Sequence, residues 1–139
     1  GPARIYVASP VTEASIACIV ADALKRHGYQ VTSTWHFDVQ AGRDPFVVYS
    51  KQESLRINLQ DMASADMAVA WTATGRGKGT YGEIGRMLAQ GKPVVWIQGE
   101  TGDGSSIDDA DPGVVVVKSC AEVEVMGAVA RVVSERGWM

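Results

Sequence analysis

The feature that most constrains the fold is a set of short apolar runs that alternate with stretches of helical periodicity. The run Val94-Val95-Trp96-Ile97 has no polar alternation, which is typical of a strand buried on both faces. We expect the other strands at residues 4–8, 30–35, 67–71 and 114–117. Apolar residues at helical spacing predict helices between Thr12 and Gly28, from about Leu55 to Ala65, around Ile84, Met87 and Leu88, and from Val125 to Val133.

Strands that alternate with helices in this way predict a parallel sheet covered on both faces, a doubly wound (flavodoxin- or Rossmann-like) α/β domain. Five strands favour the order 2-1-3-4-5. Ligands bind such sheets beyond the carboxyl ends of the strands, near the point where the strand order reverses. Residues 6–10, the polar loop at 36–50 and residues 72–83 are therefore expected to share one crevice.

The composition is that of one globular domain over residues 1–139, with 46% hydrophobic and 21% charged residues. The net charge of −3 gives no reason to expect duplex nucleic acid or a membrane as partner. No membrane span or signal peptide is visible, so we expect a cytoplasmic protein. The Gly1-Pro2 pair is typical of a cloning scar. Cys18 and Cys120 fall in helical patterns and are expected to be free core residues.

The glycine-rich stretch at residues 75–85 is the strongest candidate for a functional site. It follows the predicted third strand and places Glu83 in the expected first turn of a helix. Glycines let a ligand approach the backbone, and free N–H groups at a helix start attract negative charge. We therefore expect Gly77, Gly79 and Thr80 to lie at a ligand and Glu83 to act on it.

Other interpretations of this stretch compete with catalysis. Residues 77–82 satisfy G-x-G-x-x-G, but they follow the third strand instead of the first, and Lys78 precedes a glycine, which excludes a Walker A loop. Thr80-x-x-Glu83 matches a capping box, and on spacing alone capping and catalysis are equally favoured. The upstream glycines and the switch-point position favour a site. Arg76 and Lys78 either hold a phosphate or keep an exposed loop soluble.

Three further side chains lie at the predicted carboxyl ends of strands. His36 is either a ligand contact or a solvated loop residue. Trp35 and Trp71 could each stack on a planar base or form a wall of the core. Two histidines and two distant cysteines give no zinc-ligand spacing, and we expect neither a metal nor a cofactor.

Four motifs, taken in their order and spacing, resemble the nucleoside 2-deoxyribosyltransferase family over roughly residues 4–98. The superfamily also includes the 2′-deoxynucleoside 5′-monophosphate N-hydrolases and related cytidylate hydrolases. The motifs are Ile5-Tyr6-Val7-Ala8-Ser9-Pro10, Asn58-Leu59 with Ala65-Asp66, Gly79-Thr80-Tyr81-Gly82-Glu83-Ile84-Gly85, and Gly91-Lys92-Pro93-Val94.

The resemblance implies an enzyme that cleaves the N-glycosidic bond of a nucleoside or nucleotide and passes the deoxyribosyl group to another base or to water. By its position in the motif, Glu83 would be the nucleophile, and Tyr6 would lie against the nucleophile and the sugar. Ala8, Ser9 and Pro10 would lie on the sugar or phosphate side of the pocket. The family also implies a homodimer or a higher homo-oligomer.

Asn58 departs from the family pattern, which commonly has an aspartate there to bind the base or supply a proton. An amide donates no titrating proton, so the base contact differs, an acid such as Asp61 or Asp38 substitutes, or activity is reduced. The loop at residues 8–11 is nearer the transferase branch than the hydrolase branch. Two other functions stay open: a catalytically silent nucleotide-binding module, and a cytokinin-activating type phosphoribohydrolase.

Overall fold

A computed structural model describes residues 1–44, 49–73, 77–99 and 110–138. Five strands in these ranges form a parallel sheet with the order β2-β1-β3-β4-β5. The strands are β1 (Arg4–Ala8), β2 (Gln30–Val31), β3 (Met67–Trp71), β4 (Val94–Ile97) and β5 (Val114–Val117). The predicted α/β fold and its strand order are confirmed.

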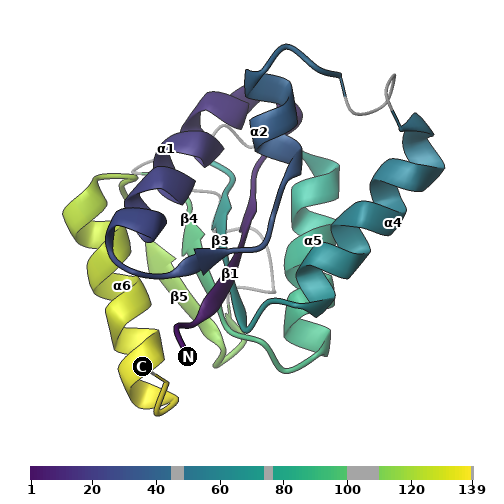
Figure 1. Cartoon of the computed structure of the whole chain (residues 1–139). Coiled ribbons are helices and arrows are strands. Elements are labelled where there is room, and N and C mark those ends of the chain that lie inside the picture. Colours follow the sequence, from purple (N-terminus) through teal and green to yellow (C-terminus); the bar gives the residue numbers. More distant parts are fainter. Residues whose placement is uncertain (45–48, 74–76, 100–109, 139) are drawn as a thin grey trace.

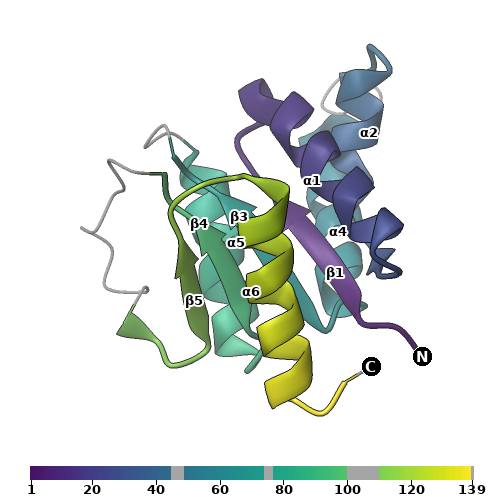
Figure 2. The same ribbon diagram turned by 90° about the vertical axis from the view of Figure 1, so that its left-hand side faces the viewer.

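Helices cover both faces of the sheet (Figure 1, Figure 2). One face carries α1 (Ala14–Arg26), which follows the 3-10 turn η1 (Val11–Glu13), and α6 (Glu122–Glu135). The other face carries α4 (Ser50–Ala63) and α5 (Lys78–Ala89). The short helix α2 (Trp35–Gln40) packs against α1. None of the helices in the described ranges has the length and apolar character needed to cross a membrane.

The core lies along the central strands. All of β4 and residues 67–70 of β3 are buried, which agrees with the absence of polar alternation in their sequences. The Trp96 indole is fully buried, and its N–H donates to the Thr72 hydroxyl at 2.7 Å. Because this polar hydrogen has a partner, the large side chain contributes its full apolar area without an unsatisfied donor.

The predicted boundaries around β2 are wrong. The strand ends at Val31 instead of Trp35, and Trp35 begins helix α2. The strand prediction therefore fails over residues 32–35 and the loop prediction over residues 36–40. Residues 45–48 of the predicted loop lie outside the described residues. The side chains of Ser33 and Trp35, which follow Val31, bond to the backbone of Val7 in place of a longer strand.

The two cysteines differ in their surroundings. Cys18 is buried in α1, as predicted, and both thiols are free. Cys120 is exposed and precedes α6, so the prediction that it is a core residue in a helix is wrong. The apolar pattern around it arises from residues that follow it in α6, and Cys120 itself lies before the helix begins.

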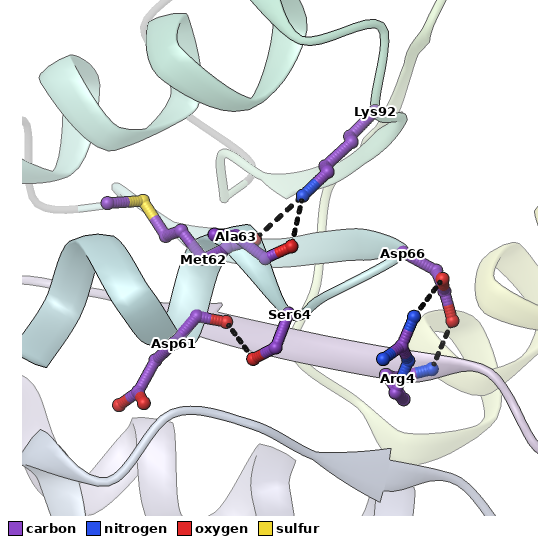
Figure 3. A network of polar contacts seen from close by, with 7 residues as sticks. All are labelled: Arg4, Asp61, Met62, Ala63, Ser64, Asp66 and Lys92. Carbon is purple, nitrogen blue, oxygen red and sulfur yellow. Dashed lines mark hydrogen bonds and ion pairs between the residues drawn. The ribbon is translucent and has the colours of Figure 1, made fainter.

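Polar contacts at the amino ends of the strands fix the end of α4 (Figure 3). The Lys92 ammonium donates to the carbonyl oxygens of Met62 at 2.9 Å and Ala63 at 3.0 Å, the last residues of α4. A cation is favourable at this end of a helix, where carbonyl groups lack partners. Beside it, Asp66 accepts from the Arg4 amide at 2.8 Å and from its guanidinium at 3.2 Å. Asp66 is therefore part of the scaffold.

Candidate active site

Gly77 sets the start of α5 and the position of the loop after β1. Its φ of 99° lies in the left-handed region, and a Cβ built there would be 2.7 Å from Pro10 Cγ. Any other residue would be strained in backbone and would clash with Pro10. The two segments that carry the predicted site therefore meet at van der Waals distance.

The capping-box interpretation of Thr80 and Glu83 is wrong. Helix α5 begins at Lys78, and its N-cap is Gly77, which has no side chain to cap the helix. Thr80 is consequently the third helical residue, and Glu83 lies in the second turn instead of the first. The positive φ of Gly77 starts the helix earlier than the spacing predicts, and the Glu83 carboxyl is directed to β1 instead of the helix start.

Glu83 accepts a hydrogen bond from a tyrosine in β1. The Tyr6 hydroxyl donates to Glu83 Oε2 at 2.5 Å. Burial raises the pKa of Glu83 to about 7, although the Tyr6 hydrogen bond and the charge of Arg86 both lower it. The pKa of Tyr6 is raised well above its usual value by burial and by the Glu83 charge. Tyr6 therefore keeps its proton, while Glu83 changes charge near neutral pH.

A cavity of about 640 Å³ opens beside Glu83. It lies between the loop after β1, helix α2, helix α4 and the first turns of α5, which is the predicted switch-point position. Its volume is in the range of small-molecule sites. The predicted site residues that line it are Ser9, Pro10, Trp35, Asn58, Gly77, Gly79, Thr80 and Glu83.

Tyr6, Ala8 and Trp71 do not line the cavity. Tyr6 has no exposed surface and contacts Glu83 from behind, so the expected contact with a sugar is corrected to a contact with the carboxyl alone. Ala8 is buried in β1. The Trp71 indole N–H donates to Glu13 at 3.1 Å, and this side chain joins β3 to η1 instead of stacking on a base.

His36 is a buried network residue, which corrects both of its predicted roles. It has no exposed surface, and its Nε2 lies 2.7 Å from Ser33 Oγ while its Nδ1 lies 3.7 Å from Cys18 Sγ. Burial, together with the charge of Lys25, lowers the pKa of His36 to about 4. The imidazole is neutral at physiological pH and faces the interior, because α2 turns it away from the cavity.

Several cavity residues were not predicted from the sequence. Arg86 lies three residues after Glu83 and lines the same wall, and helical spacing from Glu83 is the signal that would have found it. Ser54 and Met62 line the cavity from the same face of α4 as the predicted residue Asn58, as their spacing of four residues requires. The two basic residues predicted either to hold a phosphate or to keep a loop soluble are Arg76 and Lys78. Lys78 is exposed and does not line the cavity, and Arg76 lies outside the described residues.

Of the two acids that could replace an aspartate at position 58, Asp38 lines the cavity and Asp61 does not. Asp38 lies 3.7 Å from Arg43. Asp61 accepts a hydrogen bond from the Thr34 hydroxyl at 3.1 Å, and burial raises its pKa. Asp38 is therefore the acid that a ligand in the cavity would meet beside Glu83.

Fold and site together define an α/β protein with a small-molecule cavity at the switch point of its sheet and a buried, readily protonated carboxyl in the cavity wall. The sequence model described as Nucleoside 2-deoxyribosyltransferase matches residues 5–117. The chain belongs to the nucleoside 2-deoxyribosyltransferase family. Membership of this family supports N-glycosidic bond cleavage or nucleoside transfer in general.

Solved structures share the fold. The solution structure of BlsM has a TM-score of 0.78 at 18% identity, over 99% of this chain and 95% of that one. The CMP N-glycosidase BcmB of Clostridium botulinum has a TM-score of 0.64 at 15% identity, over 91% and 98%. A conserved protein from Enterococcus faecalis has a TM-score of 0.54 at 15% identity, over 92% and 99%. No curated protein sequence matches the chain.

Proposed function

We propose that this protein cleaves the N-glycosidic bond of a 2′-deoxynucleoside or a nucleoside monophosphate, with Glu83 as nucleophile. The observation that carries the proposal is the 2.5 Å contact between Tyr6 and Glu83 in the wall of a 640 Å³ cavity. Family membership supports the reaction class, and the fold is shared with a CMP N-glycosidase. The sugar passes to another base or to water.

The first step forms a glycosyl ester. A Glu83 oxygen bonds to C1′ as the C1′–N bond breaks, and the electron pair of that bond leaves with the base. Tyr6 occupies Oε2, and no hydrogen bond from the described residues reaches Oε1, so we assign the attack to Oε1. The tyrosine hydroxyl also keeps the carboxylate oriented toward the cavity, which limits the loss of entropy on reaching the transition state.

The second step releases the sugar. A nitrogen of an incoming base, or the oxygen of a water molecule, bonds to C1′ while the ester bond to Glu83 breaks and its electron pair returns to the carboxylate. The proton of the incoming group passes, in the overall balance, to the base that departed. Transfer and hydrolysis therefore share one intermediate and differ only in the second nucleophile.

The ionisation of Glu83 sets when the first step can occur. Only the carboxylate attacks C1′, and the pKa of about 7 means that this form becomes dominant above neutral pH. Burial makes the carboxylate less well solvated and hence more reactive. Tyr6 and Arg86 lower the pKa of Glu83, so the ionised form is still populated near physiological pH.

The remaining cavity wall suits a base. The Trp35 ring lines the cavity, and its N–H is already bound to the Val7 carbonyl at 3.0 Å, which leaves the apolar ring for a planar ligand. Asn58 presents both a donor and an acceptor. Asp38 is the acid we assign to proton delivery toward the leaving base, because it lines the same cavity.

The test is base release from a panel of deoxynucleosides and nucleoside monophosphates, with and without a second free base, followed by chromatography. Turnover that disappears in Glu83→Ala and persists in Glu124→Gln, an exposed carboxyl on α6, would support the proposal. A sugar adduct on Glu83, found by mass spectrometry after rapid quenching, would identify the nucleophile. No turnover across the panel, or full turnover in Glu83→Ala, would overturn it.

A binding protein without catalysis is the second candidate, favoured by Asn58 in the cavity wall where the family commonly has aspartate. It predicts that a nucleotide raises the melting temperature without release of base. Measurable turnover excludes this candidate. A marked preference for ribonucleoside monophosphates would instead favour the phosphoribohydrolase reaction.

A further inference from the structure

Strand β1 lacks a strand partner along half of one edge. Its neighbour β2 pairs only with Arg4 and Ile5, and the last backbone bond of this ladder runs from the Thr32 amide to the Ile5 carbonyl at 2.8 Å. Alternate residues of β1 face β2, so the next groups in the ladder are the amide and the carbonyl of Val7. Val7 is buried, and polar groups left unpaired there would be costly.

Two side chains replace the missing strand. Ser33 Oγ accepts from the Val7 amide at 3.0 Å, and the Trp35 indole N–H donates to the Val7 carbonyl at 3.0 Å. Both residues follow the end of β2, where the chain turns into α2. The ladder is therefore continued by a hydroxyl and an indole, and this explains why β2 can end at Val31 without leaving β1 unsatisfied.

The hydrogen-bond pattern fixes the role of His36. Because Ser33 Oγ accepts from Val7, its own proton is available for His36 Nε2, which lies at 2.7 Å. The Cys18 thiol donates its proton to the His36 carbonyl at 3.4 Å, which leaves the sulfur to accept from Nδ1 at 3.7 Å. We therefore assign the ring proton to Nδ1, so that Nε2 accepts from Ser33. A neutral imidazole is required for this arrangement, and burial favours that form.

We propose that Ser33 and His36 are positioning residues for the Tyr6 and Glu83 pair, acting through the backbone of Val7. This inference rests on the proposed function, in which Glu83 attacks the sugar. Neither residue lines the cavity, and Ser33 is bonded to the residue that follows Tyr6. His36 holds the Ser33 hydroxyl in an orientation that directs its proton to Nε2 and a lone pair to the Val7 amide.

The Tyr6 hydroxyl depends on this placement. Its contact with Glu83 is short, at 2.5 Å, and such a bond weakens steeply when either partner moves. Tyr6 is fully buried in the strand, so its side chain cannot compensate by rotating into solvent. A displacement of about 1 Å at a reacting group costs roughly 100-fold in rate.

The first experiment compares Ser33→Ala with Thr32→Val. Thr32 is the adjacent hydroxyl, and its contact with the Ile5 carbonyl is long, at 3.5 Å, on an oxygen that the Thr32 amide already occupies. We expect Ser33→Ala to lower kcat by roughly 10- to 100-fold with KM changed less than about twofold, and Thr32→Val to leave both unchanged. Equal kcat in the two variants would overturn the inference.

The second experiment separates the two ring nitrogens of His36. In His36→Gln the amide oxygen can take the place of Nε2 and accept from Ser33, whereas in His36→Asn the shorter side chain reaches only the position of Nδ1. We expect His36→Gln to retain most of kcat and His36→Asn to fall to the level of Ser33→Ala. The same kcat in both would contradict a role through Ser33.

A titration separates failure of this inference from failure of the proposed function. The Glu83 carboxyl can be followed by carbon NMR in protein labelled at glutamate, whether or not any substrate turns over. Because the Tyr6 bond lowers the pKa of Glu83, we expect Ser33→Ala and His36→Asn to raise that pKa relative to Thr32→Val. An unchanged titration in folded variants would overturn the inference. Absence of turnover in the unmodified protein would overturn only the proposed function.

Discussion

Two residues of β1 each bind a carboxyl group, with opposite consequences for its charge. At the amino end, Arg4 and Asp66 form an ion pair whose side chains are 50% and 29% exposed. In the middle of the strand, the fully buried Tyr6 donates to Glu83. Partial burial acts to raise the pKa of Asp66, but the Arg4 hydrogen bonds and the charges of Arg4 and Lys92 outweigh it and the pKa is lowered. Burial prevails at Glu83, whose pKa rises to about 7.

The difference shows that the partner and the solvent together decide what a carboxyl can do. A cation in a solvated position holds Asp66 ionised, and such exposed pairs contribute little to stability. A neutral hydroxyl in a dry position leaves Glu83 poised between two forms, at a cost to the fold, and perturbed groups of this kind are typical of functional sites. Each of the following experiments changes one of these two carboxyl sites and uses the other as its reference.

Substitution of the two carboxyls should have the largest effect. We expect Glu83→Gln to lower the rate of base release by about 10⁴-fold or more, since the amide is not a nucleophile. Asp66→Asn should leave the rate within about twofold, because the Asp66 carboxyl lies at the amino end of β1 and hydrogen-bonds only to Arg4 among the described residues. Initial rates measured by chromatography, with folding checked by circular dichroism, decide the comparison. A similar loss in Asp66→Asn would break it.

Tyr6→Phe should have the next largest effect on the reaction. Removal of the hydroxyl deletes a bond that lowers the pKa of Glu83, so we expect the pH–rate profile to move to higher pH and the maximal rate to fall by roughly 10- to 100-fold. The measurement is kcat/KM between pH 5.5 and about 9. A profile that keeps its position would show that Tyr6 does not govern the ionisation of Glu83.

The pH dependence of stability should separate the two carboxyls. The folded pKa of Glu83 is raised from 4.5 to about 7, so its contribution is fully present below about pH 4.5 and is lost as the pH rises through 7. We expect Glu83→Gln to be more stable than the unmodified protein by about 1–3 kcal/mol at pH 8, with the gap closing by pH 4.5. The lowered pKa of Asp66 acts in the other direction: its contribution is present above its ordinary value and is lost in acid. Urea unfolding at several pH values tests both signs.

Substitutions of the two basic residues at the amino end should have the smallest effects. Lys92→Met removes two hydrogen bonds to the end of α4 and should cost about 1 kcal/mol. Arg4→Met removes an exposed ion pair and should cost less than about 1 kcal/mol. Urea unfolding measures both, and neither variant should change the pKa of Glu83. A shift in that pKa would show that the Asp66 and Glu83 sites are coupled.

The sequence was sufficient for the sheet because its signals are local. Runs such as Met67–Trp71 and Val94–Ile97 coincide with β3 and β4, since buried parallel strands leave a continuous apolar pattern. Strand order followed from the alternation of strands with helices and from the connection rules. The same topology predicts that Glu83, Ser9 and Pro10 share one crevice, and all three line the cavity.

The sequence was insufficient wherever a distant side chain decided the outcome. The end of β2 depends on the hydrogen bonds of Ser33 and Trp35 to Val7, and the hydropathy pattern does not predict such bonds. His36 read as a loop residue because its partner Cys18 lies in another helix. The start of α5 depends on the positive φ of Gly77 beside Pro10. Because the helix begins earlier than the capping box predicts, Glu83 lies in its second turn.

Helix α4 shows how such a scaffold could change its substrate. The helix forms one wall of the cavity, yet its buried residues are only Ser54 and Met62, and Leu55 on the same wall is 49% exposed. Lys92 holds the carboxyl-terminal end of α4 through backbone carbonyl groups, so this contact does not depend on the side chains along the wall. Substitutions at positions such as 55, 57 and 58 would therefore cost little folding free energy, and selection could vary them while the sheet and Glu83 stay constant. Under the proposed function, this separation of the cavity wall from the core would let the bound ligand change without loss of the fold.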